Sequence, residues 1–130
     1  MAADPNKKNE AGFVLVDFQS LLETANGDES FIEEIINIFL SEIRGNIQVI
    51  SEGFDTGNFD AIGKIAHKLK SSFAILGVMD GWDTFNEIET ISRDGTDKVT
   101  IEPLVQKAIS LCEAVEAEFL NWKTCQVLKS

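Results

Sequence analysis

The chain has 130 residues, 44% of them hydrophobic, and its 11 basic and 22 acidic residues give a formal net charge of −11. This length fits one domain with a single core. So acidic a chain is a poor candidate for binding nucleic acid or an anionic membrane surface, because both draw on Lys and Arg. No stretch approaches the roughly 18 apolar residues that span a bilayer.

The N-terminus and the cysteines favour a cytoplasmic location. Residues 1–11 are polar and lack the apolar core of a signal peptide. We expect them to be disordered or introduced by cloning, and residues 12–130 to form a helical bundle domain. Cys112 and Cys125 would lie about 20 Å apart on one helix, too far for a disulfide. With one histidine and two cysteines, the sequence predicts neither a metal site nor a cofactor.

Apolar residues that recur every three to four positions predict helices along the chain. A short amphipathic helix is expected over Phe13–Thr24, ended by residues 25–27. Asp28 is a good N-cap for a long second helix that runs to about Phe54 and is ended by residues 56–57. The apolar stripe of this second helix comprises Ile32, Ile36, Phe39, Ile43, Ile47, Ile50 and Phe54.

Three more helices are predicted after residue 57. Asn58 caps the third, which closes at Gly77, and a fourth covers about Gly81–Ser92. Thr100 caps the last helix, which tolerates Pro103 in its first turn. No strand-like alternation occurs, so we predict an all-α, up-down-up-down four-helix bundle with a short additional N-terminal helix. The stripe of the last helix comprises Ile101, Leu104, Val105, Ala108, Leu111, Cys112, Val115, Phe119 and Trp122.

His67, the only histidine, lies on the third predicted helix. At about 100° per residue it falls roughly 140° from the centre of the apolar stripe, so its ring faces solvent. A lone surface histidine is most often incidental. Neutral imidazole is nevertheless a good nucleophile near physiological pH and forms covalent intermediates. The apolar stripe of this third helix comprises Ile62, Ile65, Ala66, Leu69, Phe73 and Leu76.

The helical neighbours of this histidine are cationic or small. Lys64 and Lys70 lie one turn to either side of His67. Phosphorylation of the ring would add negative charge, which the mobile positive charge of either lysine would partly neutralise. Ser71 and Ala74 leave room for the active site of a second protein. Three lysines on one helix are usually only a solvated face, although here they stand out on an acidic background. Lys68 lies about 100° from the face of the histidine, so we favour Lys64 as the auxiliary charge.

The segment Ala66–Ser72 (AHKLKSS), followed by Leu76 and Gly77, resembles the signature of histidine-containing phosphotransfer (HPt) domains. That signature reads approximately A-H-x-L-K-G-[SA]-[SA]-x-x-[LIVF]-G, and Ser71 stands where the family commonly has glycine. The helix order extends the resemblance over roughly residues 13–123. By matching position, the resemblance implies that His67 is the phosphoacceptor and that Lys70 supports the phosphoryl group electrostatically.

The resemblance implies a phosphorelay carrier. A receiver domain bearing an aspartyl phosphate would dock over His67, and Nε2 of the ring would attack phosphorus in line. A second receiver would then take the phosphoryl group, and the metal ion would belong to the receivers. No nucleotide-binding motif is present, so we expect a carrier and not an enzyme. Family resemblance also puts an apolar patch beside the histidine, for which Ala74, Ile75, residues 13–18 and the second helix are candidates.

Three alternatives remain open from the sequence. The chain could be the phosphoacceptor module of a chemotaxis-type kinase, or a fragment of a hybrid sensor kinase. It could also be a helical adaptor in which His67 is incidental, although the lysine and the small residues around the ring argue against this. The expected partners are response-regulator receiver domains and a hybrid sensor histidine kinase, with no nucleic acid and no membrane. A monomer suits a domain that must expose one helix face.

Overall fold

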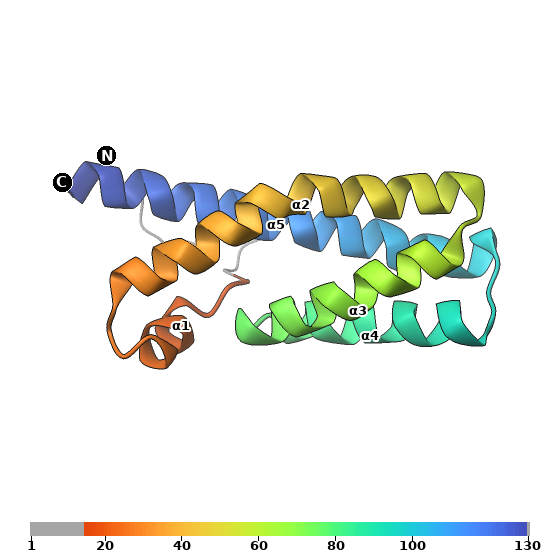
Figure 1. The fold of residues 1–130 in the computed structure, drawn as a ribbon, viewed down its shortest axis with the longest axis horizontal. Helices are drawn as coiled ribbons and strands as arrows, with labels where there is room; N and C mark the ends of the chain where they lie inside the picture. The colour runs from red at the N-terminus through yellow and green to blue at the C-terminus, as the bar shows by residue number, and fades with distance from the viewer. Residues whose placement is uncertain (1–14, 130) are drawn as a thin grey trace.

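The computed structural model describes residues 15–129, with side chains as far as residue 126. The described range is helical apart from its turns, and the helices are α1 (Phe18–Thr24), α2 (Glu29–Thr56), α3 (Phe59–Ile75), α4 (Met79–Asp94) and α5 (Lys98–Lys129). Helices α2–α5 run up and down as a four-helix bundle, and α1 lies beneath the N-terminal half of α2 (Figure 1). The predicted architecture is confirmed. The expected tail, residues 1–11, lies outside the described residues.

Most of the predicted helix ends are confirmed by their hydrogen bonds. Asp28 Oδ1 accepts from the backbone N–H groups of the first turn of α2, at 2.9 and 3.4 Å, and Asn58 Oδ1 accepts at 3.2 Å in the first turn of α3. Gly57 ends α2 with a φ of 72°, and Gly77 follows α3 with a φ of 73°. This left-handed conformation is the one that glycine adopts without strain at a helix C-terminus.

The first helix is shorter than predicted, because tertiary hydrogen bonds hold the residues before it in a non-helical path. Leu15 and Val16 donate their backbone N–H groups to the buried carboxylate of Glu118 on α5, at 3.0 and 2.9 Å. Asp17 N donates to Leu76 O at 3.0 Å. Helix α1 therefore begins only at residue 18, with Asp17 as its N-cap. The expected start of this helix, at residue 13, lies outside the described residues.

The prediction that Thr100 caps the last helix is wrong. Asp97 Oδ1 accepts a hydrogen bond from the backbone N–H of Thr100 at 2.8 Å, and α5 begins at Lys98. The same hydrogen bond is the main reason why the pKa of Asp97 lies below its ordinary value. A carboxylate three residues before a free N–H satisfies that donor and also suits the helix dipole. The fourth helix is longer than predicted, by two residues at each end, and spans Met79–Asp94.

The core lies along the axis of the bundle and is built from the predicted stripes. Their residues are buried, except that Ile47, Phe54, Ile65 and Leu104 are only partly buried. Cys112 and Cys125 are both free thiols, as expected, and both are buried. Over the described residues, no helix is long and apolar enough to cross a membrane. The largest fully buried side chains are Phe73, Phe85, Phe119, Leu21, Ile36, Ile43, Ile50, Ile62, Leu69, Leu76, Ile88 and Ile101.

Helices α3 and α4 approach closely because small residues line part of their contact. A Cβ atom added to Gly63 of α3 would lie 3.0 Å from Ser92 Cβ, and one added to Gly81 of α4 would lie 2.0 Å from Phe73 Cδ2. This short spacing allows polar side chains on the outer edge of α3 to reach those on α4. The candidate site lies on that edge.

Candidate functional site

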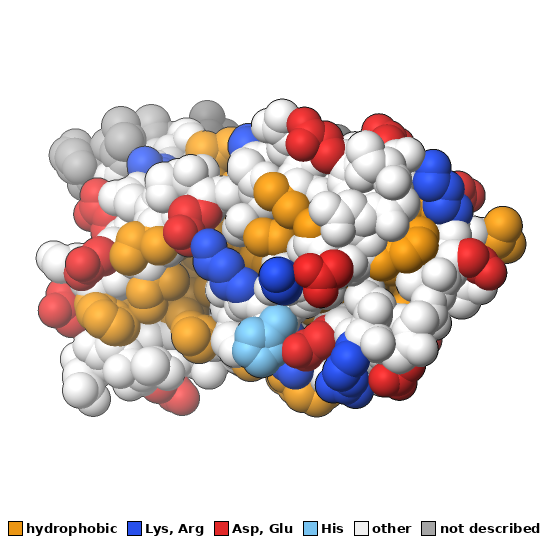
Figure 2. All heavy atoms as spheres, turned by 45° about the vertical axis from the view of Figure 1, so that its right-hand side comes forward, with side chains coloured by type: hydrophobic (Ala, Val, Ile, Leu, Met, Phe, Trp, Pro, Cys, Tyr) orange, Lys and Arg blue, Asp and Glu red, His pale blue; other side chains and the backbone are white. Residues whose placement is uncertain are grey.

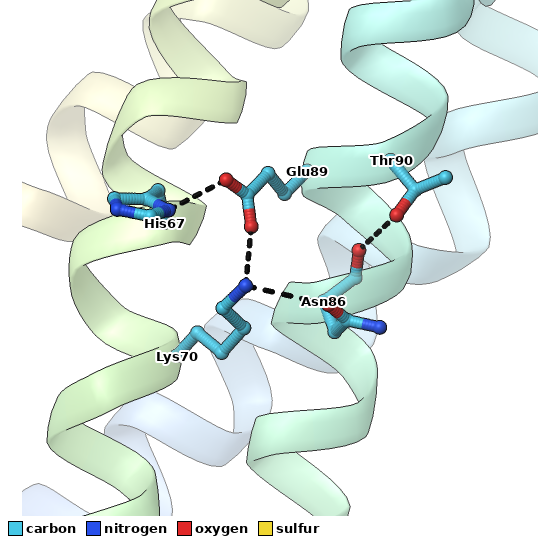
Figure 3. A network of polar contacts seen from close by, with 5 residues as sticks. All are labelled: His67, Lys70, Asn86, Glu89 and Thr90. Carbon is cyan, nitrogen blue, oxygen red and sulfur yellow. Dashed lines mark hydrogen bonds and ion pairs between the residues drawn. The ribbon is translucent and has the colours of Figure 1, made fainter.

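The imidazole of His67 lies on the outer edge of the α3–α4 pair. Its side chain is 68% exposed, as predicted from the helical wheel, and Figure 2 shows the ring at the surface among lysine and carboxylate side chains. Nδ1 lies 2.6 Å from Glu89 Oε2 on α4. The other ring nitrogen, Nε2, points away from α4 (Figure 3) and has no hydrogen-bond partner among the described residues. The ring is thus held on one side and open on the other.

Lys70 lies one turn further along α3 and is held by three residues of α4. Its Nζ is 2.6 Å from Glu89 Oε1 and 3.4 Å from Asn86 Oδ1 (Figure 3). The same ammonium group lies 5.9 Å from the centroid of the Trp82 ring, within the range of a cation–π interaction. The Lys70 side chain is only 21% exposed, so these contacts fix its position beside the histidine.

Glu89 is the residue that links the two predicted site residues, and sequence reasoning did not find it. One carboxylate oxygen faces the His67 ring and the other faces Lys70. The pKa of Glu89 lies below its ordinary value, chiefly because Lys70 donates a hydrogen bond to the carboxylate. Partial desolvation opposes this shift, and the hydrogen bond and charge of His67 add to it. A signal was present in the sequence, since Trp82, Asn86 and Glu89 recur at helical spacing on the polar flank of α4.

The other two lysines do not join this network. Lys64 Nζ pairs with Asp60 of its own helix at 3.1 Å, and its side chain is 78% exposed. Lys68 Nζ pairs with Glu42 of α2 at 3.3 Å, on the side of α3 away from α4. Lys64 does line the same surface hollow as His67, which has a volume of about 520 Å³ and is bounded by Asp60, Gly63, Lys64, His67, Glu89, Ser92 and Arg93. The role of Lys64 as an auxiliary charge stays a prediction.

An apolar groove lies on the other side of the histidine, between α2 and the C-terminal half of α3. It has a volume of about 380 Å³ and includes Ile75 of α3, which is 58% exposed, and Ile38 of α2, which is 53% exposed. The predicted small neighbours Ser71 and Ala74 are exposed, but neither lines the groove. Figure 2 shows the apolar patch beside the ring. The groove is lined by Thr24, Phe31, Ile35, Ile38, Phe39, Glu42, Asn46, Lys68, Leu69, Ser72, Ile75 and Leu76.

The apolar patch expected beside the histidine is thus present, with a different set of residues from those proposed. The second helix and Ile75 contribute to it, as expected. Phe18 does not, because its side chain is buried in the core, where its ring meets that of Phe119 edge-on at 6.1 Å. Among the described residues, no group of three or more His, Cys, Asp or Glu side chains could hold a metal ion.

A comparison with protein families shows to which family the chain belongs. Residues 34–119 match the family model of the Hpt domain, and this range includes all of α3 and α4. The chain belongs to the Hpt domain family. No curated protein and no solved structure matches the chain at a significant level. An Hpt domain implies histidine phosphotransfer within a phosphorelay, and Hpt domains exchange phosphoryl groups with receiver domains.

As an Hpt domain, the chain is a phosphotransfer module, and the bundle leaves no room for a kinase domain within these 130 residues. Its one histidine lies on the matched segment, at the surface, with one ring nitrogen accessible. The network around that histidine is built by α3 and α4 alone. The apolar groove brings in α2, so the surface around the ring has a polar side and an apolar side.

Proposed function

We propose that His67 of this Hpt domain accepts a phosphoryl group from the aspartyl phosphate of one receiver domain and passes it to another. The single observation that supports this most strongly is the open Nε2 of the only histidine, in a domain whose family works through a histidine. In the first step the Nε2 lone pair forms a bond to phosphorus while the bond from phosphorus to the aspartyl oxygen breaks. The receiver regains a free carboxylate. The second step is the reverse, on another receiver.

Lys70 is the residue that we assign to the charge of the bound phosphoryl group. An ammonium group has three N–H donors. Glu89 Oε1 and Asn86 Oδ1 take two of the Lys70 donors, which leaves one for a phosphoryl oxygen. Lys64 is a weaker candidate, because its charge is already paired with Asp60 and its side chain is almost free in solvent. Phosphoryl transfer depends mainly on positioning and electrostatic stabilisation, which suits a single well-held cation.

The apolar groove is the surface on which we propose that the receiver docks. It lies next to the histidine, and Lys68, the residue after His67, forms part of its rim. Phe31, Ile38 and Ile75 are each at least 44% exposed there, and apolar clustering of this kind on a soluble domain marks an interaction site. A receiver that reaches Nε2 must cover this area. A monomer in the cytoplasm follows from the same proposal, since the ring and the groove both have to stay open to receivers there.

The first experiment follows labelled phosphate. Receiver domains from the same genome are charged with radiolabelled phosphoryl groups and mixed with the wild-type protein or with His67→Gln. We expect label to move to the wild type only, and the product to be lost in acid and kept in alkali. Acceptance by His67→Gln would contradict the assignment. Acceptance from an ATP-dependent kinase domain and from no receiver would favour the chemotaxis-type module, and no acceptance from either would favour a helical adaptor.

A second experiment tests the docking surface. Ile75→Asp places a charge in the apolar groove, whereas Leu120→Asp places one on an apolar residue of α5 that is similarly exposed, at 52%, and lies outside the groove. Replacing an anchor residue of an interface weakens binding by about tenfold or more. We expect the dissociation constant for the receiver that donates label to rise by this factor for Ile75→Asp only. Equal effects of the two substitutions would show that the groove is not the docking surface.

A further inference from the structure

The carboxylate of Glu89 contacts both residues on which the proposed transfer depends. Its Oε2 lies 2.6 Å from His67 Nδ1 and its Oε1 lies 2.6 Å from Lys70 Nζ. Figure 3 shows the side chain reaching across from α4 to both residues of α3. Only 22% of this side chain is exposed, so the contacts are partly shielded from water. A carboxylate that contributes only to the solubility of α4 would not need to contact two side chains of another helix.

The contact with the ring decides where the imidazole proton lies. An ionised carboxylate only accepts hydrogen bonds, so the nitrogen that faces it must carry the hydrogen. In neutral imidazole one nitrogen is a donor and the other an acceptor. A proton on Nδ1 therefore leaves the lone pair on Nε2, the nitrogen that faces away from α4. In the opposite tautomer Nε2 carries the hydrogen and cannot attack phosphorus.

The contact between Glu89 and Nδ1 also stabilises the positive charge that the ring acquires during the reaction. When Nε2 gives its electron pair to phosphorus, the ring becomes a cation that still carries hydrogen on Nδ1. A carboxylate at hydrogen-bonding distance stabilises that cation, as the aspartate of a Ser-His-Asp triad does for its imidazolium. When a second receiver takes the phosphoryl group, the electron pair returns to Nε2 and the ring is again neutral with hydrogen on Nδ1. No proton has to leave Glu89 at any stage.

We propose that Glu89 is a positioning residue for phosphoryl transfer: it holds His67 in the tautomer with hydrogen on Nδ1 and anchors Lys70 beside the ring. The inference rests on the proposed function of His67. It adds a residue on a different helix, and with it the requirement that α3 and α4 stay in register for the ring to be active.

Glu89→Gln is the sharpest substitution, because Lys70 determines how the new amide must lie. Lys70 can only donate hydrogen bonds, so the amide oxygen of glutamine should face Nζ. The amide NH₂ would then face His67 Nδ1 and donate to it, which moves the imidazole hydrogen to Nε2. The substitution preserves size but selects the wrong tautomer. Glu89→Ala removes the preference without reversing it, so a positioning role predicts that glutamine is more damaging than alanine.

Glu87→Gln is the matched control. Glu87 lies two residues away on α4, is exposed and has no hydrogen bond or ion pair in the described structure. Glu87→Gln removes one negative charge from α4, as Glu89→Gln does. A loss that Glu87→Gln shares with Glu89→Gln would be an effect of net charge.

The tautomer can be read directly, because one histidine gives one set of ring ¹⁵N signals in histidine-labelled protein. We expect the neutral wild-type ring to carry hydrogen on Nδ1, Glu89→Gln to carry it on Nε2, and Glu87→Gln to match the wild type. Phosphoramidate serves as a donor that needs no receiver. Nε2 forms the bond to phosphorus, and ammonia leaves. We expect phosphorylation of Glu89→Ala to be slower by about tenfold and that of Glu89→Gln by about 100-fold or more.

Two results would overturn the inference. One is a wild-type ring with hydrogen on Nε2. The other is a Glu89→Gln variant that keeps the wild-type tautomer and the wild-type rate. The failure of the proposed function looks different. If phosphoramidate marks Nε2 in a way that depends on Glu89 but no receiver donates label, the positioning role stands and the receiver assignment falls. If receivers phosphorylate all Glu89 variants at the wild-type rate, only the positioning role falls.

Discussion

Gly81 allows α3 and α4 to meet, and replacing it with alanine tests how tightly that contact is packed. A Cβ atom at this position would lie 2.0 Å from Phe73 Cδ2 and 2.8 Å from Cε2. Carbon atoms in contact are normally about 3.5–4.0 Å apart, so the ring would have to recede by about 1.5 Å or more. The Phe73 ring is fully buried and packs against Phe39 and Phe85, at centroid distances of 6.2 and 5.0 Å. The ring therefore cannot recede without displacing these buried neighbours.

The expected loss of stability follows from these distances. Overpacking a well-packed core costs about 1–3 kcal/mol, and disturbing an aromatic pair adds about 0.5–1.5 kcal/mol. The gain in helix propensity from glycine to alanine offsets at most about 1 kcal/mol. We therefore expect Gly81→Ala to lower the free energy of unfolding by about 0.5–4.5 kcal/mol. Gly45→Ala is the matched control, because its Cβ would have no atom within 4 Å, and this substitution should stabilise the protein slightly.

Urea unfolding followed by far-ultraviolet circular dichroism measures both variants. Phe73→Leu should recover part of the loss in the Gly81→Ala background, since a smaller side chain vacates the space that Cβ needs. The two substitutions should therefore be non-additive. A Gly81→Ala protein as stable as the wild type would refute the reasoning, because it would mean that α4 moves away from α3 at little cost. The precise reach from Glu89 to His67 would then not depend on that packing.

Three further predictions concern single side chains. Lys70→Ala should slow phosphoryl transfer from the donating receiver by at least about tenfold with unchanged helicity, whereas Lys64→Ala should have little effect, and equal rates for Lys70→Ala and wild type would reduce Lys70 to a solubility residue. The pKa of Glu89 is lowered from 4.5 in the folded protein, so ionised Glu89 stabilises the fold above about pH 4.5 and this contribution is lost as the pH falls through the lower folded value. The difference in urea midpoint between wild type and Glu89→Gln should therefore shrink as the pH is lowered. A difference that stays constant with pH would contradict this. Burial raises the pKa of Cys112 to about 12, so in a Cys125→Ser background its thiol should react with a disulfide reagent at about pH 8 only as fast as the protein opens, and rapid stoichiometric reaction would show that it is not buried.

The periodicity of the sequence was sufficient to predict the fold, because each helix of the bundle buries one continuous stripe. Capping residues also gave most of the helix ends, since their hydrogen bonds are local. Distant residues caused the error at the first helix. Residues 15–17 read as helical, yet Glu118 and Leu76 supply hydrogen-bond partners that hold them in another conformation. The error at the last helix is local: Asp97, and not Thr100, accepts the hydrogen bond of the first turn, and both residue types are favourable N-caps.

The candidate site was only half predictable for the same reason. The positions of His67 and Lys70 follow from one helix, and a wheel is sufficient to place them on its exposed side. The partner of both, Glu89, lies 22 residues after the histidine, on another helix. Periodicity gives the face of each helix but not the register between two helices. The close approach at Gly63 and Gly81, where an added Cβ atom would lie 3.0 Å from Ser92 Cβ and 2.0 Å from Phe73 Cδ2, constrains that register and cannot be read from one helix.

The buried carboxylate of Glu118 means that the folding unit is longer than the segment by which the family is recognised. The matched range, residues 34–119, begins inside α2 and ends one residue after this glutamate. A chain trimmed to that range would lose the two backbone N–H groups of residues 15 and 16 that donate to the buried Glu118 carboxylate, and losing hydrogen bonds to a buried charged group is destabilising. It would also lose Leu21 and Trp122, which are buried in the intact protein. Expression of residues 34–119 alone should therefore give an aggregating fragment. A stable form of this family member has to include α1 and the last turns of α5.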